Sequence, residues 1–117
     1  MAHAVVWFDV PVTDLDRAVR FYSGVLGRSI KNEFPDFAVL AHGDSEVAGC
    51  LVRKRGDLPS EGGPLLYFSV PGRLDEAVRL VPELGGKVIE PNHPIGPFGF
   101  RAIVLDSEGN RIALHSD

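Results

Sequence analysis

Two stretches of the chain, Trp7-Phe8-Asp9-Val10-Pro11 and Tyr67-Phe68-Ser69-Val70-Pro71, share one pattern at an offset of 60 residues. The stretches that follow them, Leu15-Asp16-Arg17-Ala18-Val19-Arg20 and Leu74-Asp75-Glu76-Ala77-Val78-Arg79, correspond at an offset of 59. A repeat of this kind indicates that one supersecondary unit occurs twice. We therefore expect a single domain over residues 1–117, with module one at about 3–53, a linker at about 54–63 and module two at about 64–117.

The order of apolar runs predicts the arrangement βαβββ in each module. Each module opens with a run rich in β-branched and aromatic residues, at 3–10 and 65–70. Apolar residues at helical spacing then predict helices at 15–26 and 74–84. Three further strands are expected in each module, at 29–33, 37–41 and 47–53 and at 87–90, 100–105 and 111–115, with turns at 42–45 and 106–110. This order predicts an α+β fold in which the paired modules form a cupped, mainly antiparallel eight-stranded sheet with two covering helices.

The helix ends carry their own signals. Thr13 stands three residues before Asp16, an approximate capping box, and Gly27 is placed to end the first helix. Pro82 interrupts the second helical pattern, and an interior proline removes a backbone donor and clashes with the preceding turn. We expect a kink or an early end there.

Composition excludes several classes of function. The hydrophobic fraction of 44% excludes a disordered chain, and no apolar run approaches the roughly 20 residues that a membrane-spanning helix needs. The net charge of −4, with scattered basic residues, argues against a nucleic-acid surface, and nothing predicts a membrane partner. The single cysteine, Cys50, excludes an intramolecular disulfide and is most simply a core residue. The expected compartment is the cytoplasm.

Three segments resemble the vicinal oxygen chelate superfamily, which holds glyoxalase I, extradiol dioxygenases and bleomycin-resistance proteins. They are the opening Val10-Pro11-Val12-Thr13-Asp14-Leu15-Asp16-Arg17-Ala18, the ending Asp106-Ser107-Glu108-Gly109-Asn110-Arg111-Ile112-Ala113-Leu114-His115, and Ile95-Gly96-Pro97-Phe98-Gly99-Phe100. The last, together with residues 86–89, is similar to a glyoxalase-related branch of uncharacterised activity. The resemblance implies paired βαβββ modules around a cupped sheet, usually in a homodimer.

The metal enzymes of that superfamily hold a divalent ion with His, Gln or Glu from four strands. The resemblance places the four ligand positions on Trp7, the run 48–50, Leu66 or Tyr67, and Ala113. None of these positions offers His, Glu or Asp, and the nearest donor is Cys50, whose soft thiolate does not suit a site of imidazole and carboxylate. We predict no cofactor, and a divalent metal only through non-standard ligands.

Side chains alternate between the two faces of a strand, and this alternation predicts which candidate binding residues face the cup. If Trp7 faces the cup, so does Asp9, while Val6, Phe8 and Val10 face the helix. An acid in a strand needs a partner, so Asp9 either pairs with Arg101 or Arg111, or acts as a general base or an anchor for a cationic ligand. The same alternation brings Tyr67 and Ser69 to the cup of module two. His115 shares a face with Ala113 and either lines the cavity or caps the end of its strand.

The remaining candidates lie in the glycine-rich segment before residue 101. Phe98 and Phe100 form either a flap over a pocket or part of the core, and His93 lies on a predicted loop between prolines. We expect a protein that binds a small organic molecule, with Trp7, Tyr67, Phe98 and Phe100 as apolar walls and Asp9, Ser69 and His115 as polar anchors. The alternatives are a lyase, isomerase or dioxygenase-like enzyme that uses Asp9, His115 or a reassigned metal site, and a structural dimerisation module.

Overall fold

The computed structural model describes residues 4–32, 34–40, 47–53, 56 and 58–117. The elements, in chain order, are β1 (Trp7–Pro11), α1 (Leu15–Leu26), β2 (Phe37–Val39), β3 (Ala48–Val52), β4 (Leu66–Ser69), α2 (Leu74–Glu83), β5 (Lys87–Pro94), the 3₁₀ turn η1 (Gly96–Phe98), β6 (Phe100–Leu105) and β7 (Arg111–Ser116). The strands form two sheets with the orders β1-β3-β2 and β4-β7-β6-β5. The predicted α+β class, with one helix in each repeated module, is confirmed. None of the helices in the described segments is long and apolar enough to cross a membrane.

The repeat is also visible in the strand pairing. The first strand of each module pairs in parallel with the last, β1 with β3 and β4 with β7, and the remaining pairs are antiparallel. The structure differs from the prediction at 29–33, because residues 29–32 form no regular strand and residue 33 lies outside the described residues. Ile30 is a single buried anchor there, and the Asn32 amide donates to the Asp16 carboxylate at 2.6 Å. The described strands therefore number seven, in two sheets. The turn predicted at 42–45 lies outside the described residues.

Helix α1 begins one residue away from the predicted cap and ends at the predicted glycine. The N-cap is Asp14, whose carboxylate accepts from the Arg17 backbone N–H at 3.0 Å, so the prediction of Thr13 as the cap is wrong by one residue. Thr13 donates instead to Glu108, a residue of the other module. Gly27 ends the helix with a φ of 65°, the left-handed conformation that favours glycine.

Helix α2 ends at Glu83, one residue after Pro82 and one residue before the predicted end. Proline in the last turn cannot donate a backbone hydrogen bond and blocks further helical turns. The Gly86 N–H donates back to the Val81 carbonyl at 2.9 Å, which satisfies an end carbonyl of the helix. The early end that Pro82 predicts therefore agrees with the structure.

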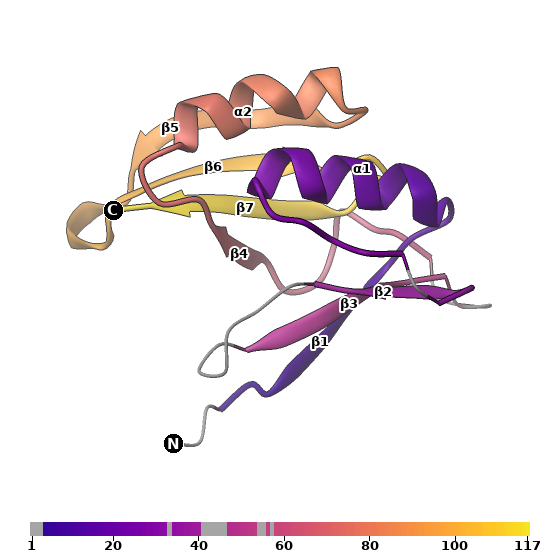
Figure 1. The fold of residues 1–117 in the computed structure, drawn as a ribbon. Coiled ribbons are helices and arrows are strands. Elements are labelled where there is room, and N and C mark those ends of the chain that lie inside the picture. The colour runs from indigo at the N-terminus through magenta and orange to yellow at the C-terminus, as the bar shows by residue number, and fades with distance from the viewer. Residues whose placement is uncertain (1–3, 33, 41–46, 54–55, 57) are drawn as a thin grey trace.

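The core joins the two modules. Figure 1 shows α1 and α2 on the same side of the β4-β7-β6-β5 sheet, with the β1-β3-β2 sheet below them at an angle. The rings of Phe8 and Phe68 meet edge to face with centroids 5.8 Å apart, and Tyr22 lies 5.5 Å from Phe68. Val10 is buried as predicted, but Val6 is 73% exposed. The prediction for Val6 is wrong because β1 begins only at Trp7, so strand alternation does not extend to it.

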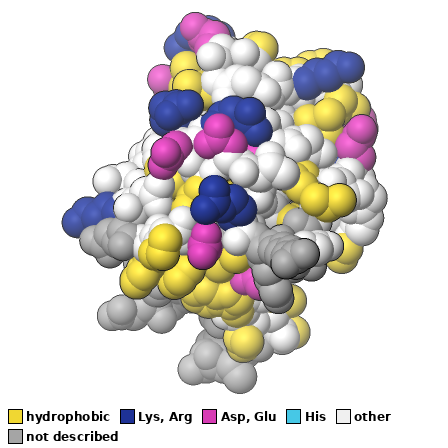
Figure 2. Space-filling model, turned by 90° about the vertical axis from the view of Figure 1, so that its right-hand side faces the viewer, with side chains coloured by type: hydrophobic (Ala, Val, Ile, Leu, Met, Phe, Trp, Pro, Cys, Tyr) yellow, Lys and Arg dark blue, Asp and Glu magenta, His cyan; other side chains and the backbone are white. Residues whose placement is uncertain are grey.

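The surface mixes charges of both signs. On the face drawn in Figure 2, basic and acidic side chains are interspersed over the upper part, and hydrophobic side chains gather lower down. Among the described residues, the exposed large hydrophobic side chains include Trp7, Tyr67 and Phe98. This face shows no extended area of one charge sign that would attract a polyanion.

Candidate functional site

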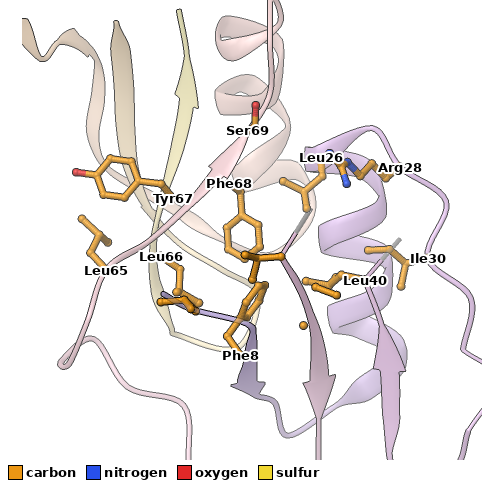
Figure 3. Close-up of a pocket in the computed structure, with 14 residues that line it drawn as sticks. Phe8, Leu26, Arg28, Ile30, Leu40, Leu65, Leu66, Tyr67, Phe68 and Ser69 are labelled. Atoms are coloured by element: carbon orange, nitrogen blue, oxygen red, sulfur yellow. The ribbon is translucent and has the colours of Figure 1, made fainter. Parts of the chain in front are cut away.

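A cavity of about 490 Å³ lies at the junction of the two modules. Its walls are mainly apolar, and Figure 3 shows Leu26, Ile30 and Leu40 on one side and residues 65–69, which include β4, on the other. Strand β4 stands at the edge of its sheet, so one row of its backbone N–H and C=O groups has no partner in the ladder. The cavity is therefore a mainly apolar hollow beside an edge strand, and one side of that strand is not used by its own sheet.

A glycine shapes the inner wall of this cavity. A Cβ added to Gly49 would lie 2.5 Å from the Phe8 ring, closer than real Cβ atoms approach, so only glycine allows the ring to rest on β3. From that position the Phe8 ring meets Phe68 across the module junction. Gly49 therefore sets how far the aromatic wall extends into the cavity.

A second cavity, of about 300 Å³, shares Phe8 and Leu66 with the first. Asp9 and Arg111 both line it, yet the two side chains form no ion pair. The Arg111 guanidinium donates instead to the Glu61 carbonyl at 2.9 Å. Arg101 also has other partners, so the prediction that Asp9 pairs with one of these arginines is wrong.

The partners of Asp9 are neutral groups on its own sheet. The Trp7 Nε1–H donates to Asp9 Oδ1 at 3.0 Å, and the Cys50 thiol donates to the same oxygen at 3.2 Å. Burial, together with the hydrogen bond and charge of Asp9, raises the pKa of the Cys50 thiol to about 11. Cys50 is buried, as expected of a core residue, and stays a protonated donor at neutral pH.

The face of the β4-β7-β6-β5 sheet that points away from α2 brings polar residues into two rows. Cross-strand register places one row in the order Tyr67, Ala113, Ile103, Glu90 and the next row in the order Ser69, His115, Arg101, His93. Side chains of one face stand side by side at these spacings. Tyr67, Ser69 and His115, three of the predicted binding residues, therefore lie together. The structure adds His93, which lies in β5 and not on the predicted loop.

Arg101 lies in the middle of this polar face. Its Nε–H donates to His93 Nε2 at 3.0 Å, and its Nη1 donates to the Tyr67 hydroxyl. The guanidinium also lies 6.0 Å from the centroid of the Tyr67 ring. Our sequence reasoning considered Arg101 only as a partner of Asp9. The alternation within 100–105 places Arg101 and Ile103 on one face, and pairing of this strand with 111–115 could have identified Arg101 as a neighbour of His115.

The other predicted binding residues do not belong to these two rows. Trp7 and Asp9 lie on β1, in the other sheet. Phe98 is 72% exposed in η1, and its carbonyl accepts a hydrogen bond from His115 Nε2 at 2.6 Å. Phe100 precedes Arg101 on β6, so it points to the opposite face, where it lines a different cavity near the start of α2. Neither phenylalanine is a core residue.

The residues at the four positions that the resemblance assigns to metal ligands do not fit a divalent ion. Register pairs Trp7 with Ala48, the first residue of the run 48–50, and pairs Tyr67, one of the two candidates for the third position, with Ala113. None of these residues has an imidazole or a carboxylate, and the Cys50 thiol, which donates to Asp9, is the nearest donor atom. Within the described segments, no group of three or more His, Cys, Asp or Glu residues is arranged to hold a metal ion.

Solved structures show the same fold over nearly the whole chain. A glyoxalase/bleomycin resistance protein from Albidiferax ferrireducens aligns with a TM-score of 0.81 and 18% identity, covering 98% of this chain and 99% of that one. A glyoxalase-related enzyme from Fulvimarina pelagi gives 0.78 and 15%, covering 99% and 89%. The fosfomycin resistance protein FosX from Listeria monocytogenes gives 0.72 and 15%, covering 100% and 95%. At these identities the likeness shows the fold alone.

Comparison with curated proteins gives no match. The family model of the glyoxalase/bleomycin resistance protein/dioxygenase superfamily matches residues 2–114. This match spans both modules, and the repeat, the parallel pairing of the first and last strands and the shared fold agree with it. The chain therefore belongs to the glyoxalase/bleomycin resistance protein/dioxygenase superfamily.

Proposed function

We propose that the protein binds a small organic molecule in the cavity at the module junction. The observation that carries this proposal is the cavity itself, about 490 Å³ in volume and lined by apolar side chains of both modules. Apolar walls with a few polar groups at one side are typical of ligand pockets. Tyr67 and Ser69, predicted as binding residues, belong to its lining and supply that polar side.

We further propose that binding needs no divalent ion at the superfamily's metal positions. The support is the chemistry of the residues that the resemblance assigns to those positions, which offer no His, Glu or Asp and only the Cys50 thiol as a nearby donor. These residues are Trp7, the run 48–50, Leu66 or Tyr67, and Ala113. A protein of this fold can then act by sequestering its ligand, as bleomycin-resistance proteins do. The ligand is held by apolar contact and by hydrogen bonds to β4.

We also propose that the protein forms a homodimer and is located in the cytoplasm. Val5, Val6 and Trp7 are 58%, 73% and 47% exposed at the start of β1, an edge strand. Contiguous apolar side chains next to a free strand edge favour association, and a second copy of the chain presents the same surface in return. The protonated, buried Cys50 suits a reducing compartment.

Nile red, a neutral dye whose fluorescence rises in apolar surroundings, tests the cavity. We expect saturable binding of the dye by the wild type. Val47 lines the cavity, so the larger indole of Val47→Trp should occupy part of it and weaken binding at least about tenfold. The matched control is Ile89→Trp, which adds the same indole on β5, away from the cavity. Absence of saturable binding by the wild type, or equal loss in both variants, overturns the proposal.

A further inference from the structure

We propose that Arg73 holds one wall of the junction cavity in place and thereby limits how fast a bound molecule leaves. Arg73 does not itself line the cavity. It acts through the end of α1, so it is a positioning residue. The inference rests on the ligand binding proposed above and adds how that site opens and closes.

One wall of the cavity depends on where α1 ends. Figure 3 shows Leu26, Arg28 and Ile30 on one side of the cavity and β4 on the other. Leu26 is the last residue of α1, and Arg28 and Ile30 follow the C-cap Gly27. A displacement of the end of α1 therefore displaces this wall relative to β4.

Arg73 connects this wall to the opposite one. It follows β4 in the chain, and its backbone N–H donates to the carbonyl of Val70, the residue after the last residue of β4, at 3.0 Å. Its side chain reaches back to α1, where Nη1 donates to the Val25 carbonyl at 3.0 Å. A single residue thus joins the end of β4 in module two to the end of α1 in module one.

The Val25 carbonyl needs a donor from outside its own helix. The last carbonyls of an α-helix have no N–H partner within the helix. The Ser23 carbonyl is satisfied by the backbone N–H groups of Gly27 and Arg28, whereas the Val25 carbonyl accepts from Arg73. Val25 is 0% exposed, so loss of the guanidinium leaves a buried acceptor without this bond. A positive charge at the carboxyl end of a helix is also favoured by the helix dipole.

The guanidinium fits closely against the end of α1. A Cβ added to Gly27 would lie 3.0 Å from Arg73 Cζ and 3.1 Å from its Nη1, so the guanidinium packs on the bare backbone of this glycine. On its other side, Arg73 Nε lies 3.6 Å from the Glu76 carboxylate. The guanidinium is therefore held between the end of α1 and the first turn of α2.

Loss of the bond to Val25 should release the wall. Leu26 and Ile30 are 8% and 7% exposed, so the wall is closed in the structure. A hydrogen bond from a charged donor changes the equilibrium between closed and open forms by about tenfold or more. A molecule enclosed in the cavity leaves through the open form, so its dissociation rate rises with the population of that form.

Stopped-flow measurement of Nile red dissociation tests the effect on the ligand. Arg73→Met removes the guanidinium and keeps a long side chain, and we expect the dye to leave at least about tenfold faster, with Arg73→Lys between this variant and the wild type. The matched control is Arg17→Met, the same substitution near the opposite end of α1, where the guanidinium also binds module two through Glu108. Both variants should lose stability on urea unfolding, but only Arg73→Met should change the dissociation rate of the folded protein. An unchanged rate in Arg73→Met, or an equal rise in Arg17→Met, overturns the proposal.

Amide hydrogen exchange tests the wall without any ligand. In Arg73→Met the amides of residues 26–30 should exchange at least about tenfold faster, relative to the amides of β7, than they do in the wild type, and Arg17→Met should show no such increase. Unchanged exchange at residues 26–30 in Arg73→Met overturns the role of Arg73. Absence of Nile red binding by the wild type overturns both proposals, whereas dye binding with unchanged exchange or unchanged dissociation in Arg73→Met overturns only this one, so the two failures are distinguishable.

Discussion

Glu108 and Arg17, 91 residues apart in sequence, form a bidentate ion pair that joins the last turn of module two to the first helix of module one. The Nε to Oε2 distance is 2.7 Å, and the Nη2 to Oε1 distance is 3.0 Å. Glu108 Oε1 also accepts from the backbone N–H groups of Thr13 and Asp14, each at 2.9 Å. The carboxylate thus binds the start of α1, where the helix dipole favours a negative charge.

This arrangement predicts a loss of stability in acid. Burial by itself raises the pKa of Glu108, but the Arg17 guanidinium and the amides of Asp14 and Thr13 outweigh it and lower the pKa to about 2. The unfolded chain, with an ordinary pKa near 4.5, then binds more protons as pH falls from about 4.5 to about 2, so the stabilisation is present above this window and is lost within it. Urea unfolding of Glu108→Gln should show a deficit of about 1–2 kcal/mol at neutral pH, after allowance for solvent screening, that shrinks in acid. Glu83→Gln, on an exposed pair, serves as the control, and a deficit independent of pH contradicts the prediction.

Tyr22→Phe tests the neighbouring buried contact between the modules. The Tyr22 hydroxyl donates to Asp106 Oδ2 at 2.6 Å, and both side chains are almost fully buried. We expect a loss of about 1–3 kcal/mol on thermal or urea unfolding, because the Asp106 carboxylate loses one donor while buried. Tyr67→Phe removes a hydroxyl from an exposed ring and should change the stability much less. Similar stabilities of the two variants would contradict a structural role for the buried contact.

Gly49→Ala tests the packing of the aromatic wall. The added Cβ meets the Phe8 ring at 2.5 Å, so the ring must move away from its contact with Phe68. Overpacking of this kind costs about 1–3 kcal/mol, and differential scanning calorimetry should record the lower melting temperature. Gly62→Ala is the control, since its nearest added contact is Ser60 Oγ at 3.5 Å. A Gly49→Ala protein as stable as the control would show that Phe8 is free to shift.

Cys50 should react slowly with thiol reagents. Its raised pKa, about 11, leaves little thiolate at neutral pH, and the side chain is buried. In the folded protein the rate of alkylation by iodoacetamide should keep rising with pH toward 11, whereas the urea-unfolded chain should level off near the ordinary value for a thiol. A folded-state rate that levels off near that ordinary value would contradict the raised pKa.

Val6→Glu tests the proposed homodimer. A carboxylate placed among Val5, Val6 and Trp7 faces its own symmetry-related copy in a two-fold interface, where like charges repel. Light scattering coupled to size-exclusion chromatography should report a dimer for the wild type and a monomer for the variant. Phe98→Glu, which places the same charge on another exposed apolar residue, should leave the dimer intact. A monomeric wild type contradicts the proposal directly.

The fold was largely predictable because its signals are local or periodic. The spacing of apolar residues located α1 at its observed bounds, and Gly27 and Pro82 marked where the two helices end. The prediction of a strand at 29–33 was wrong, because the hydrophobic Ile30 contributes a single buried side chain and not one face of a strand. Nearby, the Asn32 amide donates to the Asp16 carboxylate. The predicted N-cap was wrong by one residue because Thr and Asp are both favoured at this position. The Thr13 backbone N–H and hydroxyl donate to Glu108 of the other module instead.

The site was predictable only in part, because period-two alternation says which residues share a face but not which faces and edges meet. It brought Tyr67 and Ser69 together with His115, as the register of β4 and β7 shows. It did not reveal that Arg101 binds His93 and Tyr67, since that contact depends on the register of β6 against β5 and on side-chain conformations. The partner of Asp9 was missed for the same reason: Cys50 lies opposite it through the parallel pairing of β1 with β3.

The sequence by itself determined that the chain is a repeated βαβββ unit of this superfamily, because repeats, helical spacing and turn residues can be recognised from residues close together in the sequence. The residues at the four expected metal positions were also visible there. Only the tertiary structure decided that a cavity lies at the junction of β4 with the first module, that Glu108 joins the modules, and that Arg101 donates to His93 and Tyr67. These features arise from residues tens of positions apart, and their contacts depend on how the two sheets pack, which local sequence patterns do not encode.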